Sequence, residues 1–301
     1  MKKILAFLLT TIFLFGFDYK LELKKVTDGV WVFLGKNEPV KKSNGGNIAN
    51  SYWVDTGKHW VVIDSGATYE YAKEAYNIMQ KKANLPIAFV FNTHLHDDHW
   101  MGNSFYKEKK IPIYATKAQN EEYKNTKTSR ILNILGKKDL EGTKIVKVDK
   151  IFDKNETLKV DNLEFNFIKI PYPAHTKEDF MVYLPSKGVL FTGDILMNER
   201  LTSIRHGSIE GNLKAIKLIE KINPKIYANG HGKFFGKEGI ELTRSYLLDL
   251  KKEALKAIDN DMDINEFAKK ADFSKYKKYY LYDVANKENL FAAFKEYEFF
   301  E

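Results

Sequence analysis

Residues 93–99, with the sequence Thr-His-Leu-His-Asp-Asp-His, place three imidazoles and two carboxylates in one short segment. Neutral imidazole suits zinc, iron, copper and nickel, and carboxylates often share a transition metal with histidine. The preceding run 86–92 is short, apolar and rich in β-formers, which predicts a buried strand. The ligand types therefore follow a strand end, where open α/β sheets place their sites. A polar loop with hydrogen-bonded histidines is the alternative, but this density favours a site for two neighbouring metal ions, with candidate ligands His94, His96, Asp98 and His99.

Three further candidate ligands stand at the ends of predicted strands. His175 follows Pro-Tyr-Pro-Ala, Asp194 ends the strand-like run Gly-Val-Leu-Phe-Thr-Gly, and His231 lies between two glycines after an apolar run. Each alone has an ordinary explanation, because Gly-Asp is a common turn and a histidine beside glycine is commonly a loop residue. In this order, together with the 93–99 segment, they indicate one metal-binding constellation.

These ordered segments resemble those of the metallo-β-lactamase-fold superfamily, in which His-x-His-x-Asp-His, a single His, a Gly-Asp and a Gly-His recur. The resemblance covers most of residues 22–233 and includes the earlier segments 45–54 and 61–66. It implies an α/β fold, the αββα sandwich, in which two sheet halves are covered by helices. The predicted organisation is a metallo-β-lactamase-like domain over residues 18–238 and a short helical C-terminal extension over 239–301, packed on that domain.

The resemblance also implies which residue would hold which ion. The first ion would be held by His94, His96 and His175, the second by Asp98, His99 and His231, and Asp194 would bridge the two. Asp64 would be a buried residue that orients the metal-binding loop. Asp97, which lies between ligands, is expected to be a solvated spacer.

The expected chemistry follows from two zinc ions. Such ions, about 3.5 to 4 Å apart, can share a hydroxide at neutral pH and polarise a carbonyl or phosphoryl oxygen. The sequence contains no cysteine, which excludes a thiol nucleophile and the cysteine ligand used by one large class of β-lactamases. In those lactamases the position of Asp194 carries cysteine or serine, so this chain looks more like thioesterases of the glyoxalase II type, lactonases and phosphodiesterases.

The prediction is therefore a binuclear zinc hydrolase that uses a metal-bridging hydroxide on a small-molecule substrate, a thioester or other ester- or lactone-like carbonyl compound. Asp98 and His206 are the candidate catalytic residues. His206 is placed to protonate a leaving group, and its alternative interpretation is an exposed loop histidine.

Three alternative functions stay open. One is a β-lactam hydrolase. Another is a mononuclear iron enzyme that resembles persulfide dioxygenases, with His94, His175 and Asp194 as ligands. The third is a noncatalytic metal-binding partner of a periplasmic redox system. Segments 190–194, 200–207 and 229–232 are similar to periplasmic zinc metallohydrolases linked to sulfur oxidation or quinoprotein dehydrogenases, which suggests a redox or sulfur-carrier partner.

The N-terminal residues predict export. Lys2 and Lys3 precede the apolar stretch 4–15, so residues 1–17 are expected to be a signal peptide and the protein periplasmic. An uncleaved anchor is the alternative, although the stretch is shorter than the roughly 20 residues of a membrane span. The net charge is +8, but the lysines are spread along the chain, which is typical of solvated faces, so no nucleic-acid partner is expected.

Alternating apolar patterns predict strands over 30–33, 48–54, 60–64, 145–148, 163–170, 181–184 and 189–191, with helices over 69–82 and 212–222. His59, in the turn before the third of these strands, is expected to be structural. The aromatic cluster within 276–297 is expected to be the buried face of a helical tail, with a substrate wall or a dimer contact as the alternative.

Residues 120–138 predict a positively charged helical insertion beside the site. Its Lys127, Arg130 and Lys137 are expected on a solvated helix face, the alternative being contact with an anionic substrate.

Overall fold

The first half of the chain builds a seven-stranded sheet in the spatial order β1 to β7. The computed structural model describes residues 17–122, 124, 126–234, 236 and 239–299. The strands are β1 (Leu23–Thr27), β2 (Val30–Phe33), β3 (Ser51–Asp55), β4 (Trp60–Ile63), β5 (Ile87–Asn92), β6 (Ile113–Thr116) and β7 (Lys150–Phe152). Because β4 and β5 are parallel neighbours, their carboxyl ends lie at the same edge of the sheet.

The second half builds a five-stranded sheet in the order β12-β11-β10-β9-β8. Its strands are β8 (Glu156–Val160), β9 (Leu163–Lys169), β10 (Phe180–Leu184), β11 (Val189–Gly193) and β12 (Ile226–Asn229). The parallel pair in this sheet is β11 with β12. The residues that follow these two strands, Asp194 and His231, therefore also share one edge.

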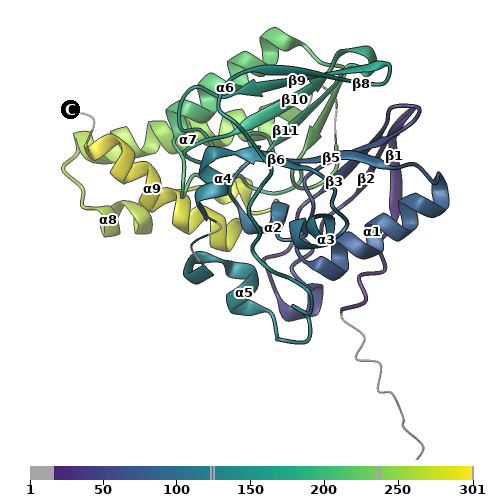
Figure 1. Ribbon diagram of the computed structural model, residues 1–301. Coiled ribbons are helices and arrows are strands. Elements are labelled where there is room, and N and C mark those ends of the chain that lie inside the picture. The colour runs from purple at the N-terminus through teal and green to yellow at the C-terminus, as the bar shows by residue number, and fades with distance from the viewer. Residues whose placement is uncertain (1–16, 123, 125, 235, 237–238, 300–301) are drawn as a thin grey trace, which may run out of the picture.

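The two sheets pack face to face around an aromatic and β-branched core. Phe91 from the first sheet and Phe167 from the second have ring centroids 4.6 Å apart, and both side chains are buried. Alternate residues along each strand point to opposite faces, so the strands also have apolar outer faces to cover. Helices α1 (Tyr69–Lys82) and α3 (Asn103–Glu108) cover the first sheet, and α6 (Ile209–Ile222) and α7 (Ile240–Asp259) cover the second (Figure 1). The predicted αββα sandwich is confirmed.

Most elements lie where the apolar pattern predicts them. The predicted helix over 69–82 coincides with α1, which begins after Thr68 because the Thr68 hydroxyl accepts the Tyr71 amide, and Ala75 and Met79 lie on its buried face. The strand predicted over 145–148 is wrong. That segment lies outside the ladder, and pairing with β6 begins at Lys150, after the Asp149 amide bonds the Ile113 carbonyl.

The C-terminal extension is helical, as predicted, and comprises α7, α8 (Ile264–Lys270), a π-helical turn (Tyr282–Asn286) and α9 (Lys287–Glu298). Its aromatic residues Tyr276, Phe294 and Tyr297 are buried in the same core cluster as α6 and the outer face of the second sheet. Tyr279 and Tyr282 are partly buried against this cluster, whereas Tyr280 is 56% exposed. The tail therefore shares a core with the sandwich.

Residues 1–16 lie outside the described residues, and so does nearly all of the predicted signal peptide. In the described part of the chain, no helix combines the length and the apolar character needed to cross a membrane.

Candidate metal centre

The loop after β5 is held by a buried carboxylate at the end of β4. Asp64 accepts hydrogen bonds from the Thr93 amide (2.8 Å) and the Thr93 hydroxyl (3.0 Å). Asp64 is 2% exposed and has a positive φ of 63°, which turns the chain sharply as it leaves β4. The loop then runs into the short helix α2 (Asp97–Trp100). Asp64 thus fixes the start of the segment that carries the first candidate ligands, which is the orienting position that the resemblance implies.

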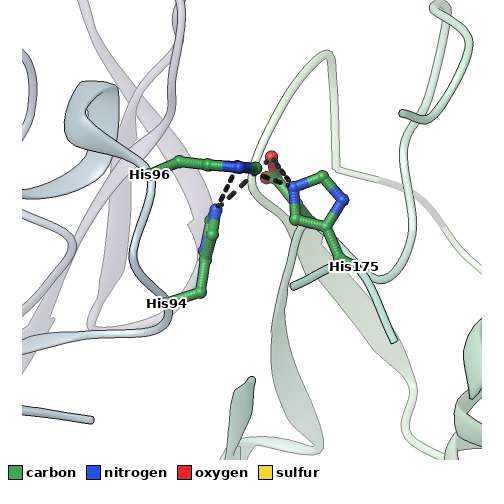
Figure 2. A group of neighbouring side chains, drawn as sticks. His94, His96 and His175 are labelled. Atoms are coloured by element: carbon green, nitrogen blue, oxygen red, sulfur yellow. Dashed lines mark hydrogen bonds and ion pairs between the residues drawn. The ribbon is translucent and has the colours of Figure 1, made fainter. Parts of the chain in front are cut away.

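One group of four side chains collects between the two sheets, and we call it the first donor group. It consists of His94, His96, His175 and Asp194, whose ligand atoms all lie within 4.8 Å of one another. The Nδ1 atom of His96 is 3.2 Å from His94 Nε2 and 2.9 Å from His175 Nε2. Figure 2 shows the three labelled imidazoles pointing toward one another, with His94 and His96 on one segment and His175 on another.

A second donor group lies beside the first and consists of Asp98, His99 and His231. His99 Nε2 and His231 Nε2 are 3.4 Å apart, and Asp98 Oδ2 is 3.5 Å from His231 Nε2. The carboxylate of Asp194 faces both groups: Oδ2 is 3.2 Å from His175 Nε2 and 3.1 Å from His231 Nε2. The structure therefore brings all seven sequence-predicted ligands together, with Asp194 between the two groups.

The hydrogen bonds behind the rings decide which nitrogen of each histidine faces the centre. The Nδ1 atoms of His99, His175 and His231 lie 2.8, 3.0 and 2.6 Å from Asp64 Oδ2, the Ser203 carbonyl and the Ile48 carbonyl. A carbonyl or an ionised carboxylate only accepts, so each Nδ1 carries a proton, and Nε2 is the atom that each ring offers to the centre. His99 Nε2 and His231 Nε2 face each other at 3.4 Å, so a proton or a metal ion must lie between these two nitrogens. The donor set therefore fits metal ions.

Burial and neighbouring charges hold most of these side chains in the protonation states that metal binding requires. His99 is the exception: burial alone would lower its pKa, but the carboxylates of Asp194 and Asp64 outweigh burial and raise that pKa well above its usual value, so a metal ion bound to this ring must displace a proton. Burial lowers the pKa values of His94 and His96 well below the usual range, which keeps both imidazoles neutral. Burial alone would raise the pKa of Asp194, but the imidazoles of His231, His99 and His175 outweigh it and hold that pKa well below its usual value. Neutral imidazole and ionised carboxylate are the forms that bind a metal.

The expectation that Asp97 is a solvated spacer is wrong. Its side chain is buried, and its Oδ2 accepts the Ser129 hydroxyl (2.8 Å) and the Ile131 amide (2.9 Å). These partners belong to the start of α5 (Arg130–Ile134), and the first amides of a helix need acceptors from outside the helix. Asp97 therefore docks the predicted insertion onto the metal-binding loop.

Arg130, predicted on a solvated face, instead reaches the centre. Its Nη2 hydrogen-bonds Asp98 Oδ1 and lies 3.2 Å from Asp97 Oδ1, which leaves Asp98 Oδ2 facing the second donor group. Although burial lowers the pKa of Arg130, Asp98 and Asp97 raise it above its usual value, so this group stays cationic. Lys127 and Lys137 are exposed, as predicted.

Sequence reasoning did not single out Arg200. Its guanidinium is buried, its Nη1 lies 3.1 Å from His231 Nδ1, and its Nε has no hydrogen-bond partner among the described residues. Burial lowers the pKa of Arg200 to about 10, so it remains a cation at neutral pH. No motif marks this residue in the sequence, because only the packing of the segment after β11 places it behind His231.

A cavity of about 580 Å³ opens beside the first donor group. Leu95 and Trp100 give it apolar walls, and its charged lining consists of Arg130, Lys177, Arg205, Asp97 and Glu122. It is also lined by Thr128, Ser129 and other residues of the 120–138 insertion, which therefore lies beside the site, as expected.

His206, the other candidate catalytic residue, also lines this cavity. Its Nδ1 is 2.9 Å from His96 Nε2. The Nδ1 atom of His96 points at the other ligand atoms of the first donor group. The proton of this ring is therefore on Nε2, which donates it in a hydrogen bond to His206. Partial burial and the neighbouring charge of Arg205 lower the pKa of His206 to about 4, so it is neutral at pH 7. The geometry therefore gives His206 the position of a residue that orients His96.

His59 lies outside the centre, in the turn before β4. Its Nδ1 is 3.0 Å from the Oδ2 atom of Asp161, which lies in the turn between β8 and β9. This contact with a neighbouring turn agrees with the structural role expected for it.

The chain is similar in sequence and in structure to known proteins. A family model described as the metallo-beta-lactamase superfamily matches residues 44–231, which is more than half of the chain. Metallo-beta-lactamase IND-1 from Chryseobacterium indologenes is 27% identical over 204 residues, or 66% of this chain and 78% of that protein. Metallo-beta-lactamase type 2 from Bacillus sp. (strain 170) is 25% identical over 247 residues, or 77% and 82%. The structure of a metallo-beta-lactamase from Pontibacter korlensis superimposes with a TM-score of 0.62 at 19% identity, over 76% of this chain and 99% of the other, which shows a shared fold.

Proposed function

The chain belongs to the metallo-β-lactamase superfamily, and from this premise we propose that it is a zinc-dependent hydrolase that holds two ions and acts on an ester-like carbonyl compound. The observation that carries the proposal is the convergence of seven ligand side chains whose ligand atoms face a shared space. When bound, a pair of zinc ions supplies a nucleophile from water at neutral pH and polarises the carbonyl oxygen of the substrate.

The residues of this chain would divide the work between holding the ions and holding their ligands. The first donor group offers three imidazoles and the second offers two imidazoles and Asp98, while the Asp194 carboxylate faces both. Asp64 fixes His99, and Arg130 turns one oxygen of Asp98 away from the centre and leaves the other facing it. Such outer contacts set ligand orientation and metal affinity.

The role of His206 as a general acid stays a prediction. A neutral imidazole with a pKa near 4 is a poor proton donor at pH 7, and its contact with His96 supports an orienting role. Removal of the His206 side chain separates the two roles, because loss of an acid changes the pH dependence of the rate, whereas loss of an orienting contact lowers metal affinity.

A thioester, ester or lactone is the favoured substrate class. The cavity beside the donor groups combines apolar walls with three cationic and two acidic side chains, which suits an acyl compound with both apolar and polar groups. The chain has no cysteine to serve as a metal ligand, and an aspartate occupies position 194.

A β-lactam is the second candidate substrate. It is favoured by the relatives named as metallo-beta-lactamases, to which this chain is 27% and 25% identical. A β-lactam is also a strained carbonyl compound, so the same centre suits both classes of substrate.

The first experiment is the metal content per chain, measured by elemental analysis of the full-length protein expressed in a bacterial host without added metal. Two zinc ions per chain, together with turnover in a panel of thioesters, lactones and β-lactams, would support the proposal and rank the substrates. His175→Ala should abolish that turnover, whereas the matched control His59→Ala, at a histidine outside the centre, should not.

Other outcomes assign the alternatives. One iron per chain with oxygen consumption in the presence of a persulfide would favour the mononuclear dioxygenase over the hydrolase. Bound zinc without turnover of any compound would favour a noncatalytic partner of a redox or sulfur-carrier protein. Fractionation of the same host tests the proposed export to the periplasm.

A further inference from the structure

One backbone carbonyl holds His175, a ligand of the first donor group, in its orientation. The Nδ1–H of His175 donates to the Ser203 carbonyl at 3.0 Å, which leaves Nε2 directed at His96 and Asp194. Ser203 belongs to the segment 201–208, which contains no helix or strand. No sheet ladder or helix therefore fixes the direction of this carbonyl, and another contact must do so.

That contact comes from Asn289 in α9. Its Oδ1 accepts the Ile204 amide at 3.0 Å, and its Nδ2 donates to the Thr202 carbonyl at 2.7 Å. The C=O of Ser203 and the N–H of Ile204 belong to one planar peptide unit, in which they point in opposite directions. Asn289 therefore accepts a hydrogen bond from the N–H of the same rigid unit whose C=O accepts the hydrogen bond from His175.

The hydrogen bonds that connect Asn289 to His175 are shielded from water. Asn289 is 0% exposed, His175 is 2% exposed, and Ile204 and Thr202 are buried as well. A hydrogen bond to the N–H of a peptide also polarises its C=O and strengthens it as an acceptor. Loss of the Asn289 amide would leave two buried backbone groups without partners, and the segment would have to rearrange to satisfy them.

We propose that Asn289, in the C-terminal extension, is a positioning residue for the first metal ion, because it fixes the peptide unit that orients His175. The inference rests on the metal-binding part of the proposed function and deepens it. The helical tail then takes part in the metal centre without contributing a ligand.

The test is a competition titration of metal-free protein with Zn²⁺ against a chromophoric chelator. Asn289→Ala should weaken binding of the first ion about tenfold to a hundredfold, the usual effect of removing a contact behind a metal ligand. The visible spectrum of the Co²⁺-loaded protein, which reports ligand geometry, should change as well.

Asn286→Ala is the matched control. Asn286 is a buried amide just before α9 whose Oδ1 accepts the Tyr246 hydroxyl at 3.0 Å, and among the described residues it makes no hydrogen bond to the 201–208 segment. Asn289 Nδ2 contacts the same hydroxyl at 3.1 Å. Both variants should unfold at lower denaturant concentration, but only Asn289→Ala should lose metal affinity.

Equal losses of affinity in the two variants, or no loss in Asn289→Ala, would overturn the inference. If Asn289→Ala does not fold, Asn289→Asp replaces it, because this variant keeps the oxygen for the Ile204 amide and lacks the donor for Thr202. Asn289→Asp should show a smaller loss of metal affinity, and an affinity equal to that of the wild type would contradict the inference.

The wild-type protein separates the inference from the proposed function. A wild-type chain that binds metal but hydrolyses no substrate would contradict the proposed function alone, whereas one that binds no divalent metal would contradict both the proposed function and the inference.

Discussion

At the scale of single residues, Asp194 is the side chain on which the two donor groups meet. Its Oδ2 lies 3.2 Å from His175 Nε2 and its Oδ1 lies 3.4 Å from His99 Nε2, so one carboxylate serves both groups. In the described part of the chain Oδ1 receives no hydrogen bond, and a buried carboxylate oxygen without one is costly unless a cation neutralises it.

Asp194→Asn should therefore remove the charge that both ions share. We expect the metal content to fall from two ions per chain to one or fewer, and activity to fall about a hundredfold or more, since even contacts behind the ligands are worth about tenfold to a hundredfold. Elemental analysis and initial rates measure the two effects. Asp161→Asn, a carboxylate that contacts His59 outside the centre, serves as the control. An unchanged metal content in Asp194→Asn would contradict the bridging position.

Arg200 places a positive charge beside the second donor group. His99 has the Asp64 carboxylate behind it, which makes its imidazole a stronger metal ligand. His231 instead has a buried guanidinium 3.1 Å from its Nδ1. This cation repels a divalent ion bound to His231.

Arg200→Met should tighten binding of the second ion by about tenfold, which corresponds to about 1.4 kcal/mol. The expected readout is a shift of the second step in a Zn²⁺ titration, with the first step unmoved. Arg200→Lys keeps the charge and should titrate like the wild type, so tighter binding in both variants would show that the charge is not the cause.

The ligands were predictable because metal chemistry restricts the residue types and the strand-end spacing is visible in the chain. His175 and Asp194 could be recognised in this way far from the 93–99 segment. Arg130 and Arg200 could not be assigned, since an arginine in a polar segment is usually solvated and only tertiary packing turns these two inward.

At the scale of elements, the loop over 199–208 is held mainly by the C-terminal extension. The Tyr280 carbonyl accepts the Leu201 amide, Asn289 bonds the backbone of Thr202 and Ile204, and Glu296 accepts the Ser208 hydroxyl. Glu296 also accepts the amides of Ile209 and Glu210, the first residues of α6, where a negative charge is favourable.

Glu296→Gln should destabilise the protein by about 1 kcal/mol, because it removes a charged acceptor from the start of α6. Urea unfolding of the metal-loaded protein measures the difference. Glu298→Gln removes a charge from an exposed residue of the same helix and should have little effect. A similar loss in both variants would argue against the capping role.

The sequence predicts the regular elements better than these tertiary contacts. The pattern over 69–82 is helical along its whole length and is capped by Thr68, so α1 is found where predicted. The run 145–148 has equally good strand residues, but its apolar side chains pack outside the ladder, and no local signal reveals this.

At the scale of the whole molecule, the donor groups join the two sheets. His94 and His96 follow β5 in the first sheet, while Asp194 and His231 follow β11 and β12 in the second. A bound ion therefore links the two halves of the sandwich, and it binds the folded chain far better than the unfolded one.

Removal of the metal should lower the melting temperature. An ion present at about a hundred times its dissociation constant stabilises the fold by about 2.7 kcal/mol. For a chain of this size, that corresponds to a shift of several degrees, because each kcal/mol shifts the midpoint by about 2–4 °C. Calorimetry with and without a chelator measures it, and Asp194→Asn should respond less. A wild-type midpoint that ignores the chelator would contradict the link between the sheets.

The dependence of the 199–208 loop on the tail has a consequence for biosynthesis. All seven ligands precede residue 232, whereas the anchors Tyr280, Asn289 and Glu296 are synthesised later. A nascent chain that has just exposed His231 carries the complete ligand set but cannot yet fix the peptide unit behind His175. If Asn289 positions His175 as proposed, metal loading into the finished geometry follows the synthesis of α9 rather than the appearance of the last ligand.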